Sequence, residues 1–191
     1  FITSQPFDEI KLTLTNVVNV EVGSFSVYSV FAQKLCDFDL LCNEAYSLTY
    51  PTFPVIINSA NTGVEGAICA GCAVDDIDAV LTASTDDYAT ISLPVAVASS
   101  ASISVLNNFN LPSGTFAGFT VRNPNSILQL DLLNSITITT YKDGVEVESN
   151  SGSNLLNLTL LTPILGSGTD IYNIGFYASA SFDEIRITLG S

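Results

Sequence analysis

The sequence predicts an all-β fold, an antiparallel two-sheet β-sandwich of the jelly-roll kind. Runs rich in β-branched and aromatic residues recur along the chain, and short clusters of Asn, Ser, Gly and Pro separate them. One Asp-Gly pair lies between two alternating runs, which is typical of a β-hairpin. Sandwiches and barrels have this spacing of short strands and turns.

The expected strands cover most of the second half of the chain. The hairpin turn is Asp143-Gly144, and only residues 75–81 show a short hint of helix. In chain order the expected strands are 91–108, 115–122, 126–133, 135–142, 145–149 and 170–178. Strands of this number and length are expected to form two sheets that bury their inner faces against each other.

Ten residues near the start of the sequence recur near its end. FDEIKLTLTN occupies residues 7–16 and FDEIRITLGS occupies residues 182–191, at a constant offset of 175 residues (182 minus 7). A repeat of this period has the size of a whole domain. We therefore expect one period of a tandem array. Residues 1–32 are then the C-terminal strands of a preceding copy, and residues 33–191 are one module that lacks its own last strand.

The repeated strand has two faces, because side chains alternate along a strand. Ile185, Ile187 and Leu189 share one face, which we expect to face the core. Glu184 and Arg186 lie on the opposite face, as a solvated ion pair worth well under about 1 kcal/mol or with Glu184 as a ligand at the rim. The complete opposite face is Phe182, Glu184, Arg186 and Thr188.

Residues 17–31 follow the first copy and have the pattern of one further strand with a kink at Gly23. The second copy stops at Ser191, so we expect an open sheet edge beside residues 182–189 that such a strand fills. The favoured arrangement is head to tail, with residues 17–31 completing the repeated strand of an adjacent copy. Folding back beside residues 182–189 of the same chain is the alternative.

The composition excludes some functions. Nineteen Asp and Glu residues stand against five Lys and Arg residues, so the chain has no basic patch for phosphate, and nucleic acid is not an expected partner. No apolar run reaches the roughly 20 residues of a membrane span. His, a G-x-S-x-G elbow and a Gly-rich phosphate loop are all absent from the sequence, so we do not expect an enzyme.

Four cysteines form two close pairs in the sequence, Cys36 with Cys42 and Cys69 with Cys72. Structural disulfides are the favoured interpretation, and a zinc site or a redox dithiol are the alternatives. Among the three possible connectivities, bonds between the two pairs are favoured because they close longer loops. Disulfides would indicate an extracellular location.

Several segments together resemble a known class of domains. They are AVDDIDAVLTASTDDYATISLPVAVASSASISV after the Cys-x-x-Cys motif, LPSGTFAGFTVRN, DLLNSITITTYKDGVEVES and GFYASASFDEIRITLGS. They resemble tandem β-sandwich domains of very large cell-surface and secreted proteins of Bacteroidetes, including gliding-motility adhesins exported by type IX secretion. The resemblance covers most of residues 33–191. It implies a cell-surface location, an adhesive or filament-building role, and neighbouring copies as partners, head to tail.

A second resemblance concerns one loop and the last strand. DAVLTASTDDYATI followed by FDEIRI resembles galactose-binding-like jelly rolls, in which loop oxygens and a Glu on the last strand hold a structural calcium ion. By that resemblance the calcium ligands are Asp78, Asp86, Asp87 and Glu184. The sequence departs from the pattern because Thr82 and Ala83 replace its Asp-Gly turn and its Trp is missing. A solvated acidic loop is the alternative.

The favoured function is that of an extracellular structural or adhesive repeat module, which spaces or displays a binding tip. The alternative is a lectin-like, carbohydrate-binding jelly roll, possible on fold grounds, with surface polysaccharide as its partner. Such a module would use exposed aromatic rings as sugar platforms. The candidates are Tyr46, Tyr50, Tyr88, Tyr141, Tyr172 and Tyr177.

Overall fold

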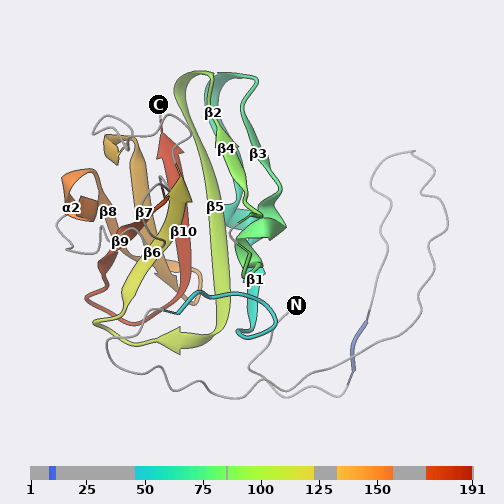
Figure 1. The fold of residues 1–191 in the computed structure, drawn as a ribbon, viewed down its shortest axis with the longest axis vertical. Helices are drawn as coiled ribbons and strands as arrows, with labels where there is room; N and C mark the ends of the chain where they lie inside the picture. The colour runs from blue at the N-terminus through green and yellow to red at the C-terminus, as the bar shows by residue number, and fades with distance from the viewer. Residues whose placement is uncertain (1–8, 12–45, 85, 123–132, 157–170, 191) are drawn as a thin grey trace.

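The computed structural model describes residues 9–11, 46–84, 86–122, 133–156 and 171–190 (Figure 1). Within these residues the fold is an all-β antiparallel sandwich, as the sequence predicts. The strands are β1 (Val55–Ile57), β2 (Gly63–Ala70), β3 (Ala73–Asp75), β4 (Thr90–Ser92), β5 (Val95–Leu111), β6 (Phe116–Arg122), β7 (Ile136–Lys142), β8 (Val145–Ser151), β9 (Ile171–Tyr177) and β10 (Phe182–Gly190).

Short helical turns connect some of these strands. The 3₁₀ helix η1 (Ser59–Asn61) separates β1 from β2, and η2 (Ile77–Leu81) follows β3 where the sequence hints at a helix. The helix α2 (Ser153–Leu156) follows β8. The predicted run 91–108 is divided between β4 and β5, with Pro94 between them. The strand predicted at 126–133 lies outside the described residues, apart from its last residue.

The long strand β5 organises the larger sheet. One of its edges pairs with β10, which pairs in turn with β7, and β7 with β8. Its other edge pairs with β1 and β2, one after the other along the strand. In Figure 1, β6 and β9 form a second, two-stranded sheet that lies across β7 and β10. A third pair, β3 with β4, lies beside β5.

The core lies between the larger sheet and the β6–β9 sheet. Apolar side chains from both layers form one buried cluster, in which Ile103, Ile138, Ile174 and Phe176 are at most 4% exposed. The hairpin prediction is confirmed. Asp143 and Gly144 have φ values of 52° and 77°, and Lys142 pairs with Val145 across the turn.

The predicted core face of β10 is confirmed. Ile185 and Ile187 are buried in the main cluster, and Leu189 packs against it. The predicted solvated face is wrong at two positions. Phe182 is fully buried in the core, because the register of β10 against β5 shifts between Phe182 and Glu184. Glu184 is only 1% exposed.

The predicted open edge beside β10 is also wrong. Residues 184–189 pair with β5 on one side and with β7 on the other. No further strand can therefore pair there, from the same chain or from another copy. Residues 17–31 lie outside the described residues, as do residues 1–32 except 9–11. The assignment of residues 1–32 to a preceding copy stays a prediction.

Candidate functional site

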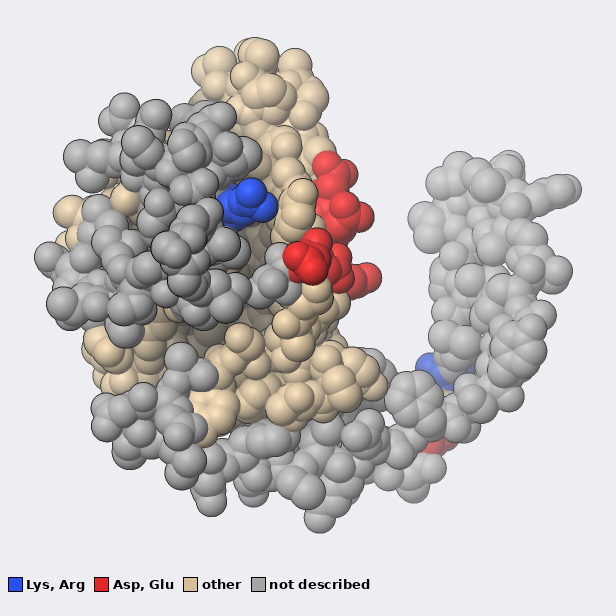
Figure 2. Space-filling view, viewed as in Figure 1, with Lys and Arg blue, Asp and Glu red and all other residues tan. Residues whose placement is uncertain are grey.

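The acidic loop that the sequence singles out lies at the edge formed by β3 and η2. Figure 2 shows acidic side chains gathered on this edge. The exposed carboxylates of this region are Asp75, Asp76, Asp78, Asp86 and Asp87. Asp76 has a φ of 52°, and this left-handed residue turns the chain from β3 into η2. Asp and Asn adopt that conformation more readily than most residues.

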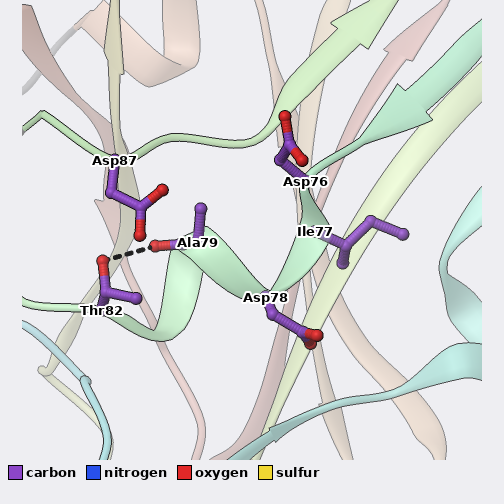
Figure 3. A pocket seen from close by; sticks show the side chains of 6 residues that line it. All are labelled: Asp76, Ile77, Asp78, Ala79, Thr82 and Asp87. Atoms are coloured by element: carbon purple, nitrogen blue, oxygen red, sulfur yellow. Dashed lines mark hydrogen bonds between the residues drawn. The ribbon is translucent and has the colours of Figure 1, made fainter.

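Three of these carboxylates line a shallow hollow of about 280 Å³. Asp76, Asp78 and Asp87 lie around it together with Thr82, whose hydroxyl donates a 3.0 Å hydrogen bond to the carbonyl of Ala79 (Figure 3). That bond closes the last turn of η2 and so fixes one wall of the hollow. The three carboxylates point in different directions rather than at one common point (Figure 3).

The predicted calcium ligands are not brought together as one group. Asp78 and Asp87 line the hollow, Asp86 is exposed outside it, and Glu184 is buried in the larger sheet. Within the described ranges, no three side chains among His, Cys, Asp and Glu gather closely enough to hold a metal ion. Calcium at the four predicted residues stays a prediction. Of the four, Asp78 and Asp87 line the same hollow.

A second hollow of about 350 Å³ adjoins the first and contains an exposed aromatic ring. Asp78 and Thr82 line both hollows, and Tyr50 lines the second with a side chain that is 61% exposed. The backbone N–H of Tyr50 donates to the carbonyl of Leu81 at 2.8 Å, which ties the ring's segment to η2. An exposed tyrosine beside a carboxylate can stack on a sugar ring and accept hydrogen bonds from its hydroxyls.

The other predicted platforms differ in exposure. Tyr88, Tyr177 and Tyr46 are 65%, 50% and 38% exposed, whereas Tyr141 is buried at 6%. The side chain of Tyr172 lies outside the described residues. Tyr50 combines high exposure with a place in the second hollow.

Glu184 is the centre of a buried polar cluster that the sequence did not predict. One carboxyl oxygen, Oε1, accepts three hydrogen bonds: from Asn58 Nδ2 at 2.8 Å, from Asn61 Nδ2 at 2.7 Å and from Ser104 Oγ at 2.5 Å. In the described part of the chain the partners of Glu184 are thus neutral groups, and its expected ion pair with Arg186 is not formed. Buried carboxyl groups need such donors, because an unsatisfied one costs several kcal/mol.

The two asparagines reach Glu184 because of the spacing of η1. Asn58 is the N-cap of η1 and Asn61 is its last residue, and both side-chain amides of this short turn reach Oε1. Two hydrogen bonds of the residues that flank η1 hold it against β5: Asn58 N donates to Ser104 O at 2.9 Å, and Ser104 N donates to the side-chain Oγ1 of Thr62 at 2.9 Å. The cluster therefore ties η1, β5 and β10 together. The Asn-x-x-Asn spacing was the only sequence signal for it.

Arg186 lies on the same face of β10 and stacks on an aromatic ring. Its guanidinium carbon is 5.0 Å from the centre of the Tyr141 ring on β7, a cation–π contact. Burial raises the pKa of Tyr141, and the positive charge of Arg186 acts in the opposite direction. The Nε–H of Arg186 is buried without a hydrogen-bond partner in the described residues.

Two further carboxyl groups lie near the β9–β10 connection. Partial burial acts to raise the pKa of Glu148, but donors from Ser179 N, Ser179 Oγ and Asn150 Nδ2 outweigh it and lower that pKa. Burial raises the pKa of Asp183, although Asp143 N donates to its Oδ2 at 3.0 Å. The Oδ1 atom of Asp183 is buried without a partner among the described residues.

The cysteine prediction is corrected in its connectivity. Cys69 and Cys72 form a disulfide with each other, with their Cα atoms 5.6 Å apart, at the turn between β2 and β3. The favoured bonds between the two cysteine pairs are therefore wrong for these two residues. The short Ala-Gly turn brings the two side chains together locally, and this proximity outweighs the loop-length argument. Cys36 and Cys42 lie outside the described residues.

Comparison with protein-family models, with curated proteins and with solved structures finds no match for this chain. Within the described residues, the helices are all too short or too polar to cross a membrane.

Proposed function

We propose that this chain is a structural and adhesive module of a large, repetitive bacterial surface protein, in which copies follow one another head to tail. Its role is mechanical: it spaces or displays a binding tip outside the cell. The proposal assigns no catalytic residue. The disulfide between Cys69 and Cys72 supports the extracellular location, because such bonds persist in oxidising compartments.

The observation that carries the proposal is the repetition of the β10 sequence. β10 is an inner strand, paired along both edges, with an aliphatic face in the core and a carboxyl group that needs three donors. Residues 7–15 carry the same pattern of Phe, Asp, Glu and alternating aliphatic residues. Residues 7–15 therefore have the sequence of an inner strand, and such a strand needs a second sheet in which to pair along both of its edges.

The described residues of the first copy support this interpretation. Glu9, Ile10 and Lys11 are exposed and form no strand, and Figure 1 draws them apart from the sheets. Ile10 is 40% exposed, whereas the equivalent Ile185 is 5% exposed. An aliphatic strand sequence that remains exposed is expected when the sheet that buries it belongs to another module.

A tandem chain tests the proposal. Residues 17–191 are joined directly after Ser191, because Asn16 and Ser191 are equivalent positions of the repeat. We expect two modules that unfold at a Tm no lower than that of the single chain. The matched control joins residues 33–191 after Ser191, which breaks the phase of the repeat and should be less stable. If the correctly phased tandem chain is no more stable than this control, the proposal that copies form a tandem array is contradicted.

A second candidate function is carbohydrate binding, supported by the hollow that contains Tyr50 and Asp78. Surface polysaccharide would be its partner. A glycan array with the isolated chain tests it, with a Tyr50→Ala variant for the platform and a Tyr177→Ala variant as the control ring outside the hollow. Binding that Tyr50→Ala abolishes and Tyr177→Ala retains would make the module a lectin. If no glycan on the array binds the chain, the carbohydrate-binding function is rejected and the mechanical role remains.

A further inference from the structure

The first part of β5 forms a two-stranded ribbon with β2 that extends beyond the rest of the larger sheet (Figure 1). β10 pairs with β5 only as far as Ser100, opposite Gly190. Beyond that point β2 continues to pair with one edge of β5, as far as Val95 opposite Ala70. Along residues 95–98, no described strand pairs with the other edge of β5. Among the described strands this edge is therefore open to strand addition, with Ser99 Oγ as a side-chain donor to the carbonyl of Val97 at 3.0 Å.

The ribbon also exposes apolar side chains. Ile68, Val95 and Val97 are 62%, 60% and 60% exposed. Ile68 is directly opposite Val97, and Val95 lies two residues further along, so the three share one face. Residues 95–98 read Val-Ala-Val-Ala and contain none of the charges that usually protect a strand edge. An apolar edge of this kind indicates that another strand covers it.

One irregularity lies in the edge, and it does not prevent pairing. Ala98 has a φ of 48°. The ladder between β2 and β5 nevertheless continues in the same register on both sides of it, with Gly66 opposite Ser99 and Ile68 opposite Val97. β2 has no residue paired with Ala98 itself, and we expect a strand on the other edge to skip Ala98 in the same way.

We propose that residues 17–22 of the following copy of this chain extend along β5 and cover the exposed ribbon, with residues 17–20 opposite residues 98–95 and residues 21 and 22 running past the start of β5. The inference rests on the proposed array. Residue 15 is equivalent to Gly190, which pairs with Ser100, so the residues after it run past 99 to 95 in antiparallel register. The sequence predicts that residues 17–31 add a strand to this sheet. Both edges of β10 are paired, so among the described strands the edge of β5 along residues 95–98 is the place where such a strand can still add.

The sequence of the segment suits this edge. Residues 17–22 read Val-Val-Asn-Val-Glu-Val, so Val18, Val20 and Val22 share one face of a strand. β-branched side chains pack well against other β-branched side chains on neighbouring strands, and Val95 and Val97 are such partners. In the proposed array these residues come directly after Ser191 on one continuous chain, so the added strand continues β10 and completes the module that contains the ribbon.

The test uses the full chain extended after Ser191 by the six residues VVNVEV, which reproduce residues 17–22 in phase with the repeat. Hydrogen exchange of the backbone amides of residues 95–98 is the readout. We expect exchange in the extended chain to be slowed by about tenfold or more relative to the unextended chain. The matched control carries the extension VDNDEV, in which the equivalents of Val18 and Val20 are Asp, and should show no slowing. A Val97→Asp substitution in the ribbon should also remove the protection, whereas Val145→Asp, at an exposed valine of β8, should not.

Each other outcome overturns the inference. Equal exchange with VVNVEV and VDNDEV would mean that the valine strand does not cover the edge. Slow exchange already present in the unextended chain at every protein concentration, and lost on Val18→Asp, would mean that the segment folds back onto its own β5. A stable, correctly phased tandem chain without protection at 95–98 would leave the proposed array standing and reject only this contact.

Discussion

Replacing Glu184 by Ala should strongly destabilise the fold, although the residue lines neither of the two hollows described above. The side chain is 1% exposed, and its Oε1 accepts three hydrogen bonds. The substitution leaves the hydroxyl of Ser104, which is 0% exposed, without its carboxyl acceptor, at a cost of about 1–3 kcal/mol. Asn58 and Asn61 are only partly buried, so water can replace part of their loss.

Adding the lost packing of the side chain, we expect a decrease of about 3–4 kcal/mol in the free energy of unfolding. A domain of this kind has about 5–15 kcal/mol in total. Glu184→Gln keeps an acceptor oxygen and should cost less, about 1–2 kcal/mol. The exposed Glu146→Ala on β8 is the control and should change stability by less than about 0.5 kcal/mol.

Urea unfolding measures these differences. With a slope near 2 kcal/mol/M, Glu184→Ala should move the midpoint down by about 2 M, and Glu146→Ala should leave it almost unchanged. If Glu184→Ala unfolds within about 0.5 kcal/mol of the original chain, then the three hydrogen bonds contribute nothing net. The account of the cluster as the tie between η1, β5 and β10 would then be refuted.

Four other outcomes are expected. Glu148→Gln should cost stability at pH 7 and cost less as the pH falls below 4.5, because the lowered pKa of Glu148 stabilises the fold only while the carboxyl is ionised. Asp183→Asn should have the opposite sign: it should add stability at pH 7 and lose that gain as the pH falls through the raised pKa towards 3.8, because burial raises the pKa of Asp183. Both are checked by urea unfolding across pH. Non-reducing peptide mapping should find Cys69 linked to Cys72, and the double Ser variant should lose about 2 kcal/mol for this short loop; a Cys69–Cys36 peptide would contradict the pairing. If the acidic loop binds calcium, a hundredfold excess of calcium over Kd should raise the free energy of unfolding by about 2.7 kcal/mol. Identical thermal melting curves with calcium and with chelator would contradict the calcium site.

The features that depend on neighbouring residues could be predicted from the sequence. Alternation placed Ile185 and Ile187 in the core, and the Asp143-Gly144 pair predicted the turn between β7 and β8. Both signals are local, because the period of a strand and the φ of a two-residue turn are properties of adjacent residues. The disulfide between Cys69 and Cys72 is local as well, but loop entropy favoured a longer connection and gave the wrong pairing.

The features that depend on strand order could not be predicted in this way. Glu184 was expected on a solvated face, because alternation does not reveal that η1 lies over that face with two amides. The open edge beside β10 was wrong for the same reason, since sequence order does not show that β5 and β7 lie on its two sides. A three-residue shift in the register between β10 and β5, between Phe182 and Glu184, accompanies the burial of the Phe182 ring in the core.

The inner position of β10 explains which of its residues are needed to fix its burial and register, and these residues recur in the first copy of the sequence. A strand at a sheet edge is released when one ladder opens, but β10 is released only when its ladders with β5 and β7 both open. A slip of two residues keeps the aliphatic face inward, yet it moves the carboxyl of Glu184 away from Asn58, Asn61 and Ser104 and leaves those donors unpaired. The residues that recur in the first copy, the acid and the alternating aliphatics, are therefore those that fix both burial and register. In the array proposed above, load that passes from one copy to the next would enter each sheet through this inner strand and not through an edge strand.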